Sequence, residues 1–593
     1  MRFPALGEFV QYLESIGELT RISATVDPYL EVTEIATRAL HEKKPALLFE
    51  NVQGSKYPLA INVYASERRI ELALGRHPQL VGEELISFFD QMVPPKLSSL
   101  WKNRVFVRRL LKAKTRAVSS GFSQQVIEPP NLSGLPIQTC WPADGGRFIT
   151  QGQVFTYDPV DRKRNVGLYR MHVYDNSTAG MHWQIQKGGG FHYHRAEKLG
   201  KEIEIAVALG TDPAVLFAAV SALPEGIDEL MFASFLRGDR IPITRGKNIG
   251  IQVPAHAEFI LEGVVLPHER RLEGPFGDHF GHYSNAAPFP VFHLRSVTHR
   301  TTPIYPATVV GIPPMEDKFL GDATQQILGP LVKLLHREVR DVWAYYEAGF
   351  HNLLVVSVEE RYKKEAMKAA LGLLGTGQLA LTKCLVLVSQ DVNPGDWPAV
   401  VREIRDHFDP HFDFVLLPKV PLDTLDFTSF VMELGSKMII DATKKQRQIK
   451  DKRLEVKENR NSRFVKDLKS IDRRITDYNV IEECFLLVKV HSGGRRVIES
   501  LVKQKPLQSF KIIAAVSEDV DIRNKENYIW GIFTRFDCER DVIFSEQGLV
   551  GISPVYKGVM GIDATWKKGY PAPLTMDPKI VKRVDERWDS YWK

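Results

Sequence analysis

Two acidic residues on a glycine- and proline-rich stretch are the clearest candidates for chemistry in this chain. Glu273 and Asp278 lie five residues apart, separated by Gly-Pro-Phe-Gly, and this spacing predicts a tight, irregular loop of the kind that holds site residues. Two nearby carboxylates and an arginine such as Arg170 can push the two carboxyl pKa values apart, so that one group stays ionised while the other hands over a proton. Taken singly, each group suits a surface salt bridge better; taken together, they predict acid–base chemistry.

A second group of residues has the character of an anion- or metal-binding site. Asn165 offers an oxygen ligand on an expected strand, and a run of three glycines follows Lys187. Such a triplet lets backbone amides approach a phosphate closely while the lysine ammonium neutralises it, although glycine triplets also form flexible turns. His192 and His194 could chelate a metal from one face of a strand, or form ordinary hydrogen bonds. The sequence leaves these alternatives open.

The composition limits the classes of protein to which the chain can belong. At 593 residues, with 44% hydrophobic and 25% charged side chains, it is too long for one core and suits about four globular domains. This excludes a mainly disordered chain, a fibre and a small disulfide scaffold. No apolar run is long enough to span a bilayer, and the N-terminus is typical of a helix rather than a signal segment. Four widely spaced cysteines without a Cys-x-x-Cys pair suit a reducing cytoplasm.

The positive charge is confined to one segment. The chain carries a net charge of +6, but residues 444–474 alone hold 13 basic and 5 acidic side chains, so the remainder is slightly negative. These residues are good helix formers of mixed charge, which favours a solvated helix or linker over a nucleic-acid-binding patch. We therefore expect no nucleic-acid partner.

The expected secondary structure places the candidate residues in a strand-rich middle region. The first part of the chain, to Pro130, mixes helix and strand signals. Residues 150–310 consist of short apolar runs separated by Gly, Pro and Asp, which predicts a barrel-like region of strands, with helical signals near residues 203–208 and 213–219. From Leu353 onward strands alternate with amphipathic helices, which is typical of a mostly parallel α/β sheet.

The last quarter of the chain repeats the preceding α/β block. Three pairs of segments recur in the same order: LVSQDV and AVSEDV, HFDP and RFDC, MIIDATKK and MGIDATWKK. Chance agreement is a poor explanation for several blocks in one order, so we predict two tandem α/β domains joined by the basic segment. Two copies are too few for a solenoid, which needs at least about three repeats.

Together, these motifs resemble the UbiD family of decarboxylases. NVGLYR, HWQ with KGGG, DELMFASFLRG, EGPFGDHFGHY and GSKMIIDAT follow the family's order, and ALLFENVQGS and MDPKIVKRVDERW are similar to its two ends. The resemblance covers nearly the whole chain; the basic segment and the second C-terminal copy depart from it. The implied fold is α+β and multi-domain, with these parts: an N-terminal α+β domain (1–130), a central split β-barrel that binds flavin (131–320), a C-terminal α/β domain in two tandem copies (321–443 and 481–593, the second with the C-terminal helix), and a basic linker (444–480).

The resemblance also implies a cofactor and partners. Family members are reversible non-oxidative decarboxylases of aromatic or unsaturated acids. They use prenylated FMN, made by a partner flavin prenyltransferase, with a divalent metal, usually Mn²⁺, and often K⁺. We therefore expect an aromatic, hydroxyarene-type carboxylic acid and CO₂ as ligands, and a cytoplasmic homo-oligomer without an integral membrane segment. A cofactor is needed because no amino-acid side chain is a good enough electron sink for the carbanion left by CO₂.

By motif, the resemblance assigns roles to individual residues. Asp278 would donate the proton that replaces CO₂, Arg170 would orient a carboxylate through its fork of N–H donors, and Glu273 would balance the charge of the network. The other implied assignments are cofactor contacts, of which Asn165, His182 and Glu229 would also bind the metal: Asn165, Leu168, Tyr169, Arg170, His182, Trp183, Gln184, Lys187, Gly188, Glu229 and Lys437.

Two other functions stay open. The doubled C-terminal domain suits a non-catalytic or assembly subunit of a multi-subunit arene carboxylase, although the complete set of Arg170, Glu273 and Asp278 argues against that. A plain flavin oxidoreductase would need a redox-partner site, and no GxGxxG fingerprint follows a strand. The second copy has Val559 where the first has Lys437, so we expect the first copy to serve the active site and the second to support assembly. The opposite assignment stays open, because only the second copy precedes the family-like tail.

Overall fold

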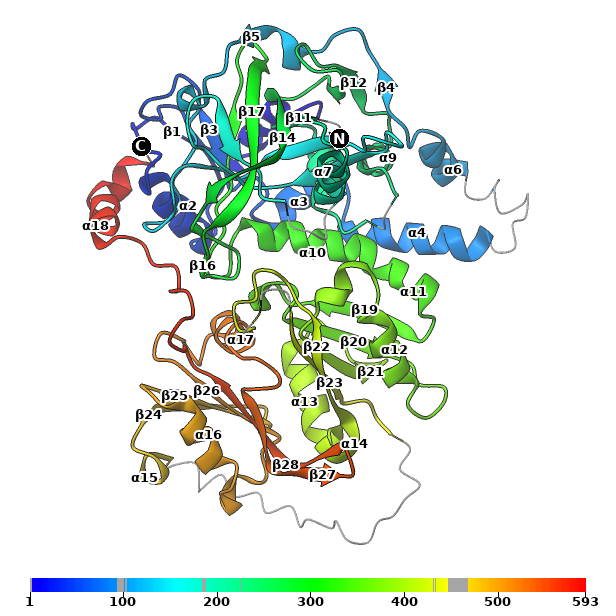
Figure 1. The fold of residues 1–593 in the computed structure, drawn as a ribbon, viewed down its shortest axis with the longest axis vertical. Coiled ribbons are helices and arrows are strands. Elements are labelled where there is room, and N and C mark those ends of the chain that lie inside the picture. The colour runs from blue at the N-terminus through cyan, green and yellow to red at the C-terminus, as the bar shows by residue number, and fades with distance from the viewer. Residues whose placement is uncertain are drawn as a thin grey trace. The chain divides into compact units, whose positions relative to one another are not determined.

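The chain forms two compact units (Figure 1). Unit 1 comprises Met1–Leu328 and Ala572–Lys593, and unit 2 comprises Gly329–Pro571. The five expected domain ranges divide the chain more finely and stay predictions. No described helix combines the length and the apolar character that crossing a bilayer would require. The computed structural model describes residues 3–92, 101, 104–183, 188–223, 226–429, 431, 434–445 and 468–592, so most of the expected basic linker lies outside the described residues.

Unit 1 begins with a small sheet whose inner strands are wholly buried. The four strands lie in the order β1 (Leu19–Ile22), β2 (Ala46–Phe49), β3 (Leu59–Ile61) and β18 (Tyr305–Pro306). Every residue of β2 and β3 is buried, which accounts for their continuous apolar sequences. The accompanying helices are α1 (Leu6–Ser15), α2 (Glu31–His41), α3 (Glu67–Leu74), α4 (Pro78–Met92), α6 (Arg104–Leu111), α10 (Glu316–Leu328) and the C-terminal α18 (Pro578–Arg587).

The centre of unit 1 is a seven-stranded antiparallel sheet that carries the candidate residues. The described strands form an open path and close no barrel, so the barrel-like region expected from the sequence is an open sheet in the described residues. Its order is β10 (Thr178–Gly180), β17 (Ala287–His299), β14 (Phe259–Glu273), β11 (Ile203–Leu209), β7 (Gln153–Tyr157) and β8 (Arg164–Leu168), with β5 (Val126–Glu128) also paired to β17. Helices α7 (Gly188–Lys198), α8 (Pro213–Val220) and α9 (Glu229–Arg237) complete this part.

One expectation in this region is wrong. Residues 203–208, expected to be helical, form strand β11, which lies between β14 and β7 and is almost wholly buried. A short, fully buried apolar run cannot be assigned to helix or strand by its periodicity alone, and here pairing on both edges decides for the strand. Residues 213–219 do form a helix, α8, which Asp212 caps by accepting a hydrogen bond from the Ala214 N–H.

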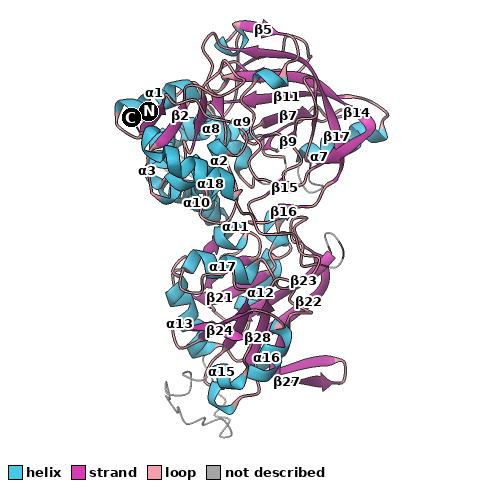
Figure 2. Ribbon diagram, turned by 90° about the vertical axis from the view of Figure 1, so that its left-hand side faces the viewer, coloured by secondary structure: helices cyan, strands magenta, loops and turns pink. Residues whose placement is uncertain are grey.

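Unit 2 contains two five-stranded sheets with the same strand order and orientation. In each, the second, third and fifth strands along the chain are parallel neighbours, and the first and fourth are antiparallel edge strands. Helices lie along both sheets, as Figure 2 shows for α13 (Trp397–His407) and α16 (Gly494–Leu501). The first sheet is β19 (Val339–Ala344), β20 (Leu353–Val358), β21 (Cys384–Ser389), β23 (Leu434–Asp441) and β22 (Phe414–Pro421); the second is β24 (Ile475–Ile481), β25 (Phe485–Val490), β26 (Ile512–Val516), β28 (Ser553–Ala564) and β27 (Val542–Val550).

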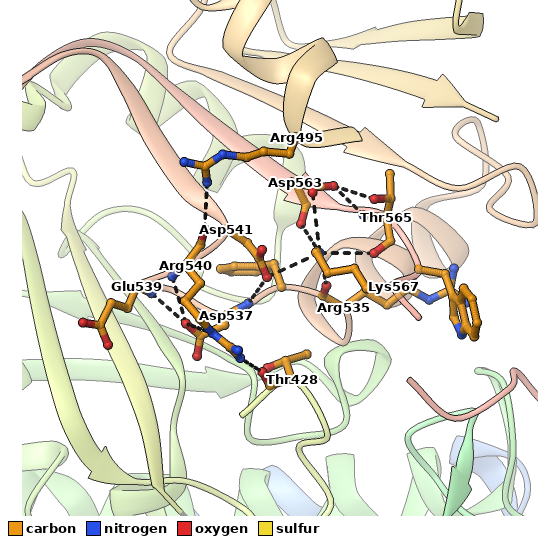
Figure 3. A network of polar contacts seen from close by, with 12 residues as sticks. Thr428, Arg495, Arg535, Asp537, Glu539, Arg540, Asp541, Asp563, Thr565 and Lys567 are labelled. Atoms are coloured by element: carbon orange, nitrogen blue, oxygen red, sulfur yellow. Dashed lines mark hydrogen bonds and ion pairs between the residues drawn. The ribbon is translucent and has the colours of Figure 1, made fainter. Parts of the chain in front are cut away.

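A buried polar network follows the last strand of each sheet (Figure 3 shows the second). After β23, the Thr443 hydroxyl donates to Asp441 Oδ1 at 2.6 Å, and Lys445 Nζ donates to the Asp441 carbonyl at 2.9 Å. After β28, Thr565 and Lys567 make the same two bonds to Asp563 at 2.6 and 2.9 Å. The same short polar motif therefore follows the last strand of both sheets.

The two sheets are joined inside unit 2 by a buried lysine. Lys383 is fully buried, and its Nζ lies 2.8 Å from Asp426 Oδ2 and donates to the Phe536 carbonyl of the second sheet's segment at 3.0 Å. A buried ion pair adds little net stability, but removing one partner leaves an uncompensated buried charge.

We expect Lys383→Met to destabilise unit 2 by about 3–5 kcal/mol, because Asp426 would be left buried without its ion-pair partner. Chemical denaturation followed by near-UV circular dichroism measures this. The double variant Lys383→Met/Asp426→Asn should recover much of the loss, and Lys503→Met, at an exposed lysine of the same unit, should change little. A loss below about 1 kcal/mol for Lys383→Met would contradict the expectation.

Candidate active site

The guanidinium of Arg170 joins the two acidic residues of the glycine-rich loop. Arg170 lies just beyond the end of β8, and its Nε donates to Glu273 Oε1 at 3.0 Å. Its Nη1 forms an ion pair with Asp278 Oδ2, and its Nη2 donates to the Ser284 hydroxyl at 3.0 Å. The side chains of Arg170, Glu273 and Asp278 are only 9%, 1% and 9% exposed, so this is a nearly dry charge network. The structure thus brings together the three residues expected to be catalytic.

The loop itself is a narrow hairpin, and Asp278 directly follows its first strand. Strands β15 (Phe276–Gly277) and β16 (Tyr283–Ser284) pair, and the Asp278 N–H donates to the His282 carbonyl at 3.1 Å. Gly274 has φ +87°, a conformation that an L side chain rarely adopts, which accounts for a glycine directly after Glu273. The guanidinium of Arg170 also lies over the Phe276 ring, 4.8 Å from its centroid.

The electrostatics keep both carboxyl groups ionised. Burial opposes the charge on each, but Arg170 and then His182 outweigh burial and lower the pKa of Glu273. In the same way, Arg170 and then His279 lower the pKa of Asp278 well below its usual range. Burial, reinforced by Arg170, lowers the pKa of His182, whose Nδ1 lies 2.9 Å from Glu273 Oε1. The guanidinium of Arg170 therefore lies between two buried carboxyl groups whose pKa values it lowers.

Two of the three expected metal ligands lie together. Asn165 on β8 donates from Nδ2 to Glu229 Oε1 at 2.8 Å, and the Val166 N–H donates to Glu229 Oε2 at 3.0 Å. Glu229 begins helix α9, and burial raises its pKa to about 7 against these hydrogen bonds. The third expected ligand, His182, makes its described side-chain hydrogen bond to Glu273 instead. In the described part of the chain, no three His, Cys, Asp or Glu side chains form a metal-binding cluster, so the expected set depends on the amide oxygen of Asn165.

The donor set nevertheless fits a metal-bound phosphate. Asn165 Oδ1 and Trp183 Nε1 are buried and have no hydrogen-bond partner among the described residues. Both border the start of α7: a Cβ on Gly188 would lie 2.8 Å from Asn165 Cγ, and a Cβ on Gly189 would lie 2.8 Å from Trp183 Nε1. The Gly189 N–H also donates to the Tyr169 hydroxyl at 3.3 Å. The free Trp183 N–H and the glycine-lined start of α7 suit an anion, and the free Asn165 oxygen suits the cation that accompanies it.

The structure places the remaining expected residues as follows. Leu168 ends β8 at the edge of the unit 1 core. Gln184 and Lys187 lie outside the described residues. Lys437 belongs to β23 of unit 2, where its Nζ donates to the Ala380 and Thr382 carbonyls at 2.8 Å each, and burial lowers its pKa to about 8. Its expected contact with a cofactor stays a prediction.

The metal-chelating alternative for His192 and His194 finds no support. Both residues lie on helix α7, not on a strand, so residues two apart do not share a face. The Nδ1 of His192 lies 2.8 Å from the Thr156 hydroxyl, so His192 is a hydrogen-bonded histidine of the core.

Two residues that hold the loop were missed by the sequence analysis. The Ser284 hydroxyl receives an Arg170 donor, and Asp144 accepts hydrogen bonds from the Gly277, Trp141 and Cys140 N–H groups at 2.7–3.0 Å. Burial raises the pKa of Asp144 to about 6 despite those bonds. The only signal was the turn-forming Asp-Gly-Gly at 144–146, which says nothing of its distant partner.

The fold and this geometry define an acid–base site beside a cradle for an anionic group. Comparison with known proteins gives its family: residues 10–89, 114–313, and 318–442 with 472–564 match the N-terminal, Rift-related and C-terminal domain models of 3-octaprenyl-4-hydroxybenzoate carboxy-lyase. The chain belongs to this family of carboxy-lyases, the UbiD family, as its motifs predicted.

Relatives extend over most or all of the chain. A Chlamydia pneumoniae protein, named as a subunit of 4-hydroxybenzoate decarboxylase, is 35% identical over 99% of this chain and 98% of its own length. Among solved structures, the vanillic acid decarboxylase of Sedimentibacter hydroxybenzoicus is 28% identical with a TM-score of 0.67, covering 74% of this chain and 92% of that one. The UbiD-class enzyme HmfF from Pelotomaculum thermopropionicum, in complex with FMN, is 27% identical with a TM-score of 0.63, covering 76% and 96%.

The ion pair of Arg170 with Asp278 predicts a pH dependence of stability. The pKa of Asp278 is lower in the folded protein than in the unfolded chain, where an aspartate titrates near about 3.9, so the pair stabilises the fold above that pH and loses its contribution as the pH falls further. We expect the calorimetric unfolding midpoint of Asp278→Asn to fall less than that of the wild type between about pH 5 and about pH 3. Asp589→Asn, at an exposed site, is the control. Parallel curves for wild type and Asp278→Asn would refute the assignment.

Proposed function

We propose that this protein is a reversible, non-oxidative decarboxylase of an aromatic, hydroxyarene-type carboxylic acid that uses prenylated FMN. The observation that carries the proposal is the position of Arg170, which holds Glu273 and Asp278 in one buried network beside the cradle formed by Asn165, Trp183 and Gly188. Family membership, and relatives whose names specify 4-hydroxybenzoate and vanillic acid, support the substrate class.

The roles of the three charged residues follow from their hydrogen bonds. A substrate carboxylate that approaches Arg170 competes with Asp278 for the guanidinium and adds a negative charge beside it. Both effects raise the pKa of Asp278, so that this carboxyl can carry the proton that replaces CO₂ at the substrate carbon. Glu273, still paired with Arg170 Nε, keeps the guanidinium in place and balances its charge. In the carboxylation direction, the ionised Asp278 accepts the proton that leaves the ring carbon.

The cradle would hold the cofactor phosphate through a divalent ion. Asn165 Oδ1 and the Glu229 carboxylate are oxygen donors of the kind that Mn²⁺ prefers, with His182 as the nitrogen donor. The Trp183 N–H and the start of α7 would receive phosphate oxygens, and Leu168 and Tyr169 would border the flavin. When bound, prenylated FMN supplies the electron sink that side chains lack. The complex of HmfF with FMN supports a flavin in this family, while Mn²⁺ and K⁺ rest on the motif resemblance.

We further propose that the open sheet of unit 1 is the flavin-binding split barrel and that the two sheets of unit 2 are tandem copies. The shared strand order and the matching networks around Asp441 and Asp563 support the duplication. The first copy, with Lys437, would serve the active site.

A partner flavin prenyltransferase, a homo-oligomeric state and a cytoplasmic location complete the proposal. The four free, buried cysteines accord with a reducing compartment.

The alternative is a non-catalytic subunit of a multi-subunit carboxylase, which the name of the Chlamydia pneumoniae relative favours because it describes one part of a larger decarboxylase. A subunit without turnover has no need of a buried arginine shared by two carboxylates, since such charges cost desolvation free energy. Purified protein that shows the absorbance of the modified flavin, but exchanges no labelled CO₂ into any arene acid, would support the alternative.

The proposed roles predict a large loss of activity in Asp278→Asn and in Arg170→Lys. The first variant lacks a transferable proton and the second lacks the bidentate fork, so we expect kcat for CO₂ release from holoenzyme to fall by about 100-fold or more in each. CO₂ release and deuterium uptake across a panel of aromatic acids provide the measurement, with Asp589→Asn as the surface control. Retention of wild-type kcat by either variant would overturn its assigned role.

The cradle can be tested without turnover. We expect Asn165→Ala to weaken Mn²⁺-dependent FMN binding by about 10-fold or more, because it removes the free amide oxygen and the bond that orients Glu229. Quenching of flavin fluorescence, titrated with and without Mn²⁺, measures this affinity. Asn51→Ala, at an exposed asparagine of unit 1, should bind FMN as the wild type does. If Mn²⁺ strengthened FMN binding equally in Asn165→Ala and wild type, Asn165 would not be a ligand.

A further inference from the structure

The chain returns from unit 2 to unit 1 at residue 572, and its first residues pair with the loop that carries Asp278. Residues 572–574, the return strand, form an antiparallel bridge with this loop. The Leu574 N–H donates to the Gly281 carbonyl at 2.9 Å, and the Tyr283 N–H donates to the first carbonyl of the return strand at 3.4 Å. The C-terminal segment therefore lies beside the hairpin formed by β15 and β16, joined to it by one isolated bridge and two backbone hydrogen bonds.

The Leu574 side chain of the return strand also packs against the loop. Leu574 is only 3% exposed, and a Cβ on Gly277 would lie 2.9 Å from Leu574 Cδ2 and 2.2 Å from Trp141 Cδ1. Leu574 and Trp141 thus lie directly over the residue that precedes Asp278, and only a glycine leaves room for both. The position of the Asp278 backbone depends on a residue almost 300 positions later in the chain.

The hairpin has little intrinsic stability of its own. Strands β15 and β16 contain two residues each, and isolated two-stranded ribbons are marginal in water. On one side, Asp144 binds the Gly277 N–H at 2.7 Å; on the other, only the return strand satisfies the Gly281 carbonyl and the Tyr283 N–H among the described backbone groups. Arg170 can meet Asp278 in one fixed geometry because both sides of the hairpin are held.

Helix α18 anchors the return strand. It follows directly in the chain, and the Tyr591 hydroxyl beyond it donates to the buried carboxylate of Glu31 on α2 at 2.7 Å. Arg587 pairs with the same carboxylate at 2.5 Å, and Arg38 of α2 bonds Asp585 at 2.5 Å. The return strand therefore lies between two fixed points, the Asp278 loop and α2.

We propose that the return strand, through Leu574, positions Asp278 for proton transfer. Leu574 contacts no reacting atom in this scheme; it is a positioning residue that acts through the Gly281 carbonyl and Gly277. The proposal deepens the proposed function, because it concerns the same carboxyl group, but its structural part can be tested on its own. The proposal predicts that a substitution that loosens the return strand changes kcat more than it changes KM.

The test compares three substitutions at Leu574 with one substitution at the neighbouring Thr575. Leu574→Pro removes the N–H donor, Leu574→Ala keeps the donor but removes the side chain from Gly277, and Leu574→Met keeps both. Thr575→Pro is the matched control, since Thr575 is exposed and its N–H makes no hydrogen bond among the described backbone groups. The full-length protein is used throughout. Leu574→Ala keeps the test decisive if Leu574→Pro fails to fold.

The first readout is amide hydrogen exchange of residues 276–284, which needs no substrate. We expect exchange there to accelerate at least about tenfold in Leu574→Pro, less in Leu574→Ala, and not in Thr575→Pro or Leu574→Met. Exchange at wild-type rate in this segment of both Leu574→Pro and Leu574→Ala would overturn the proposal, whatever the protein catalyses.

The second readout is the kinetics of the loaded holoenzyme. We expect kcat for CO₂ release to fall about 10- to 100-fold in Leu574→Pro with KM changed less than about twofold, a displaced pH profile of kcat, and recovery in Leu574→Met. Faster exchange with unchanged kcat and pH profile would overturn the positioning role. If the wild type itself converts no aromatic acid, the proposed function fails, whereas the exchange measurement still decides whether the return strand holds the loop.

Discussion

The site is organised by one electrostatic constraint: a single guanidinium is shared by two buried carboxylates. Each carboxylate alone would be too costly to bury in its ionised form, and Arg170 alone would be an uncompensated buried cation. Together they form a network in which the pKa values of Glu273 and Asp278 both fall despite burial. The end of β8, the end of β14 and the β15–β16 hairpin must therefore meet at one point.

The antiparallel sheet of unit 1 makes this meeting possible. Asn165 and Arg170 flank the last residues of β8, so one strand supplies both the oxygen ligand of the cradle and the cation of the acid–base network. His182 follows β10 and reaches Glu273 from the opposite edge of the sheet. The cradle and the proton-transferring residues are thus close in space because they share strands. This arrangement suits a reaction in which a bound cofactor accepts charge while a carboxyl group handles the proton.

Unit 2 shows that buried charge does not by itself mark a site of chemistry. Asp441 and Asp563 are buried carboxylates beside the partly exposed Lys445 and Lys567, yet each closes a turn with its own threonine, in the same geometry in both sheets. At the candidate site of unit 1, several buried polar atoms lie together without a hydrogen-bond partner among the described residues, including Asn165 Oδ1, Trp183 Nε1 and Glu273 Oε2. Buried polar atoms without a hydrogen-bond partner in the described part of the chain also occur in structural networks, as at Asp426 Oδ2, so the better mark of a binding site is the grouping of Asn165 Oδ1 with Trp183 Nε1 at the glycine-rich start of α7.

The sequence by itself determined the family, the alternation of strands and helices in unit 2, and the identity of the Arg170, Glu273 and Asp278 set, because these depend on residue type and local spacing. It could not assign residues 203–208, whose strand depends on neighbours on both edges, and it gave no sign that His192 lies on a helix and bonds Thr156. Only the tertiary structure decided what holds Asp278: Asp144, Ser284 and the return strand act through long-range contacts, largely to backbone N–H and C=O groups. Every residue carries those groups, so such pairings leave almost no trace in the order of amino acids.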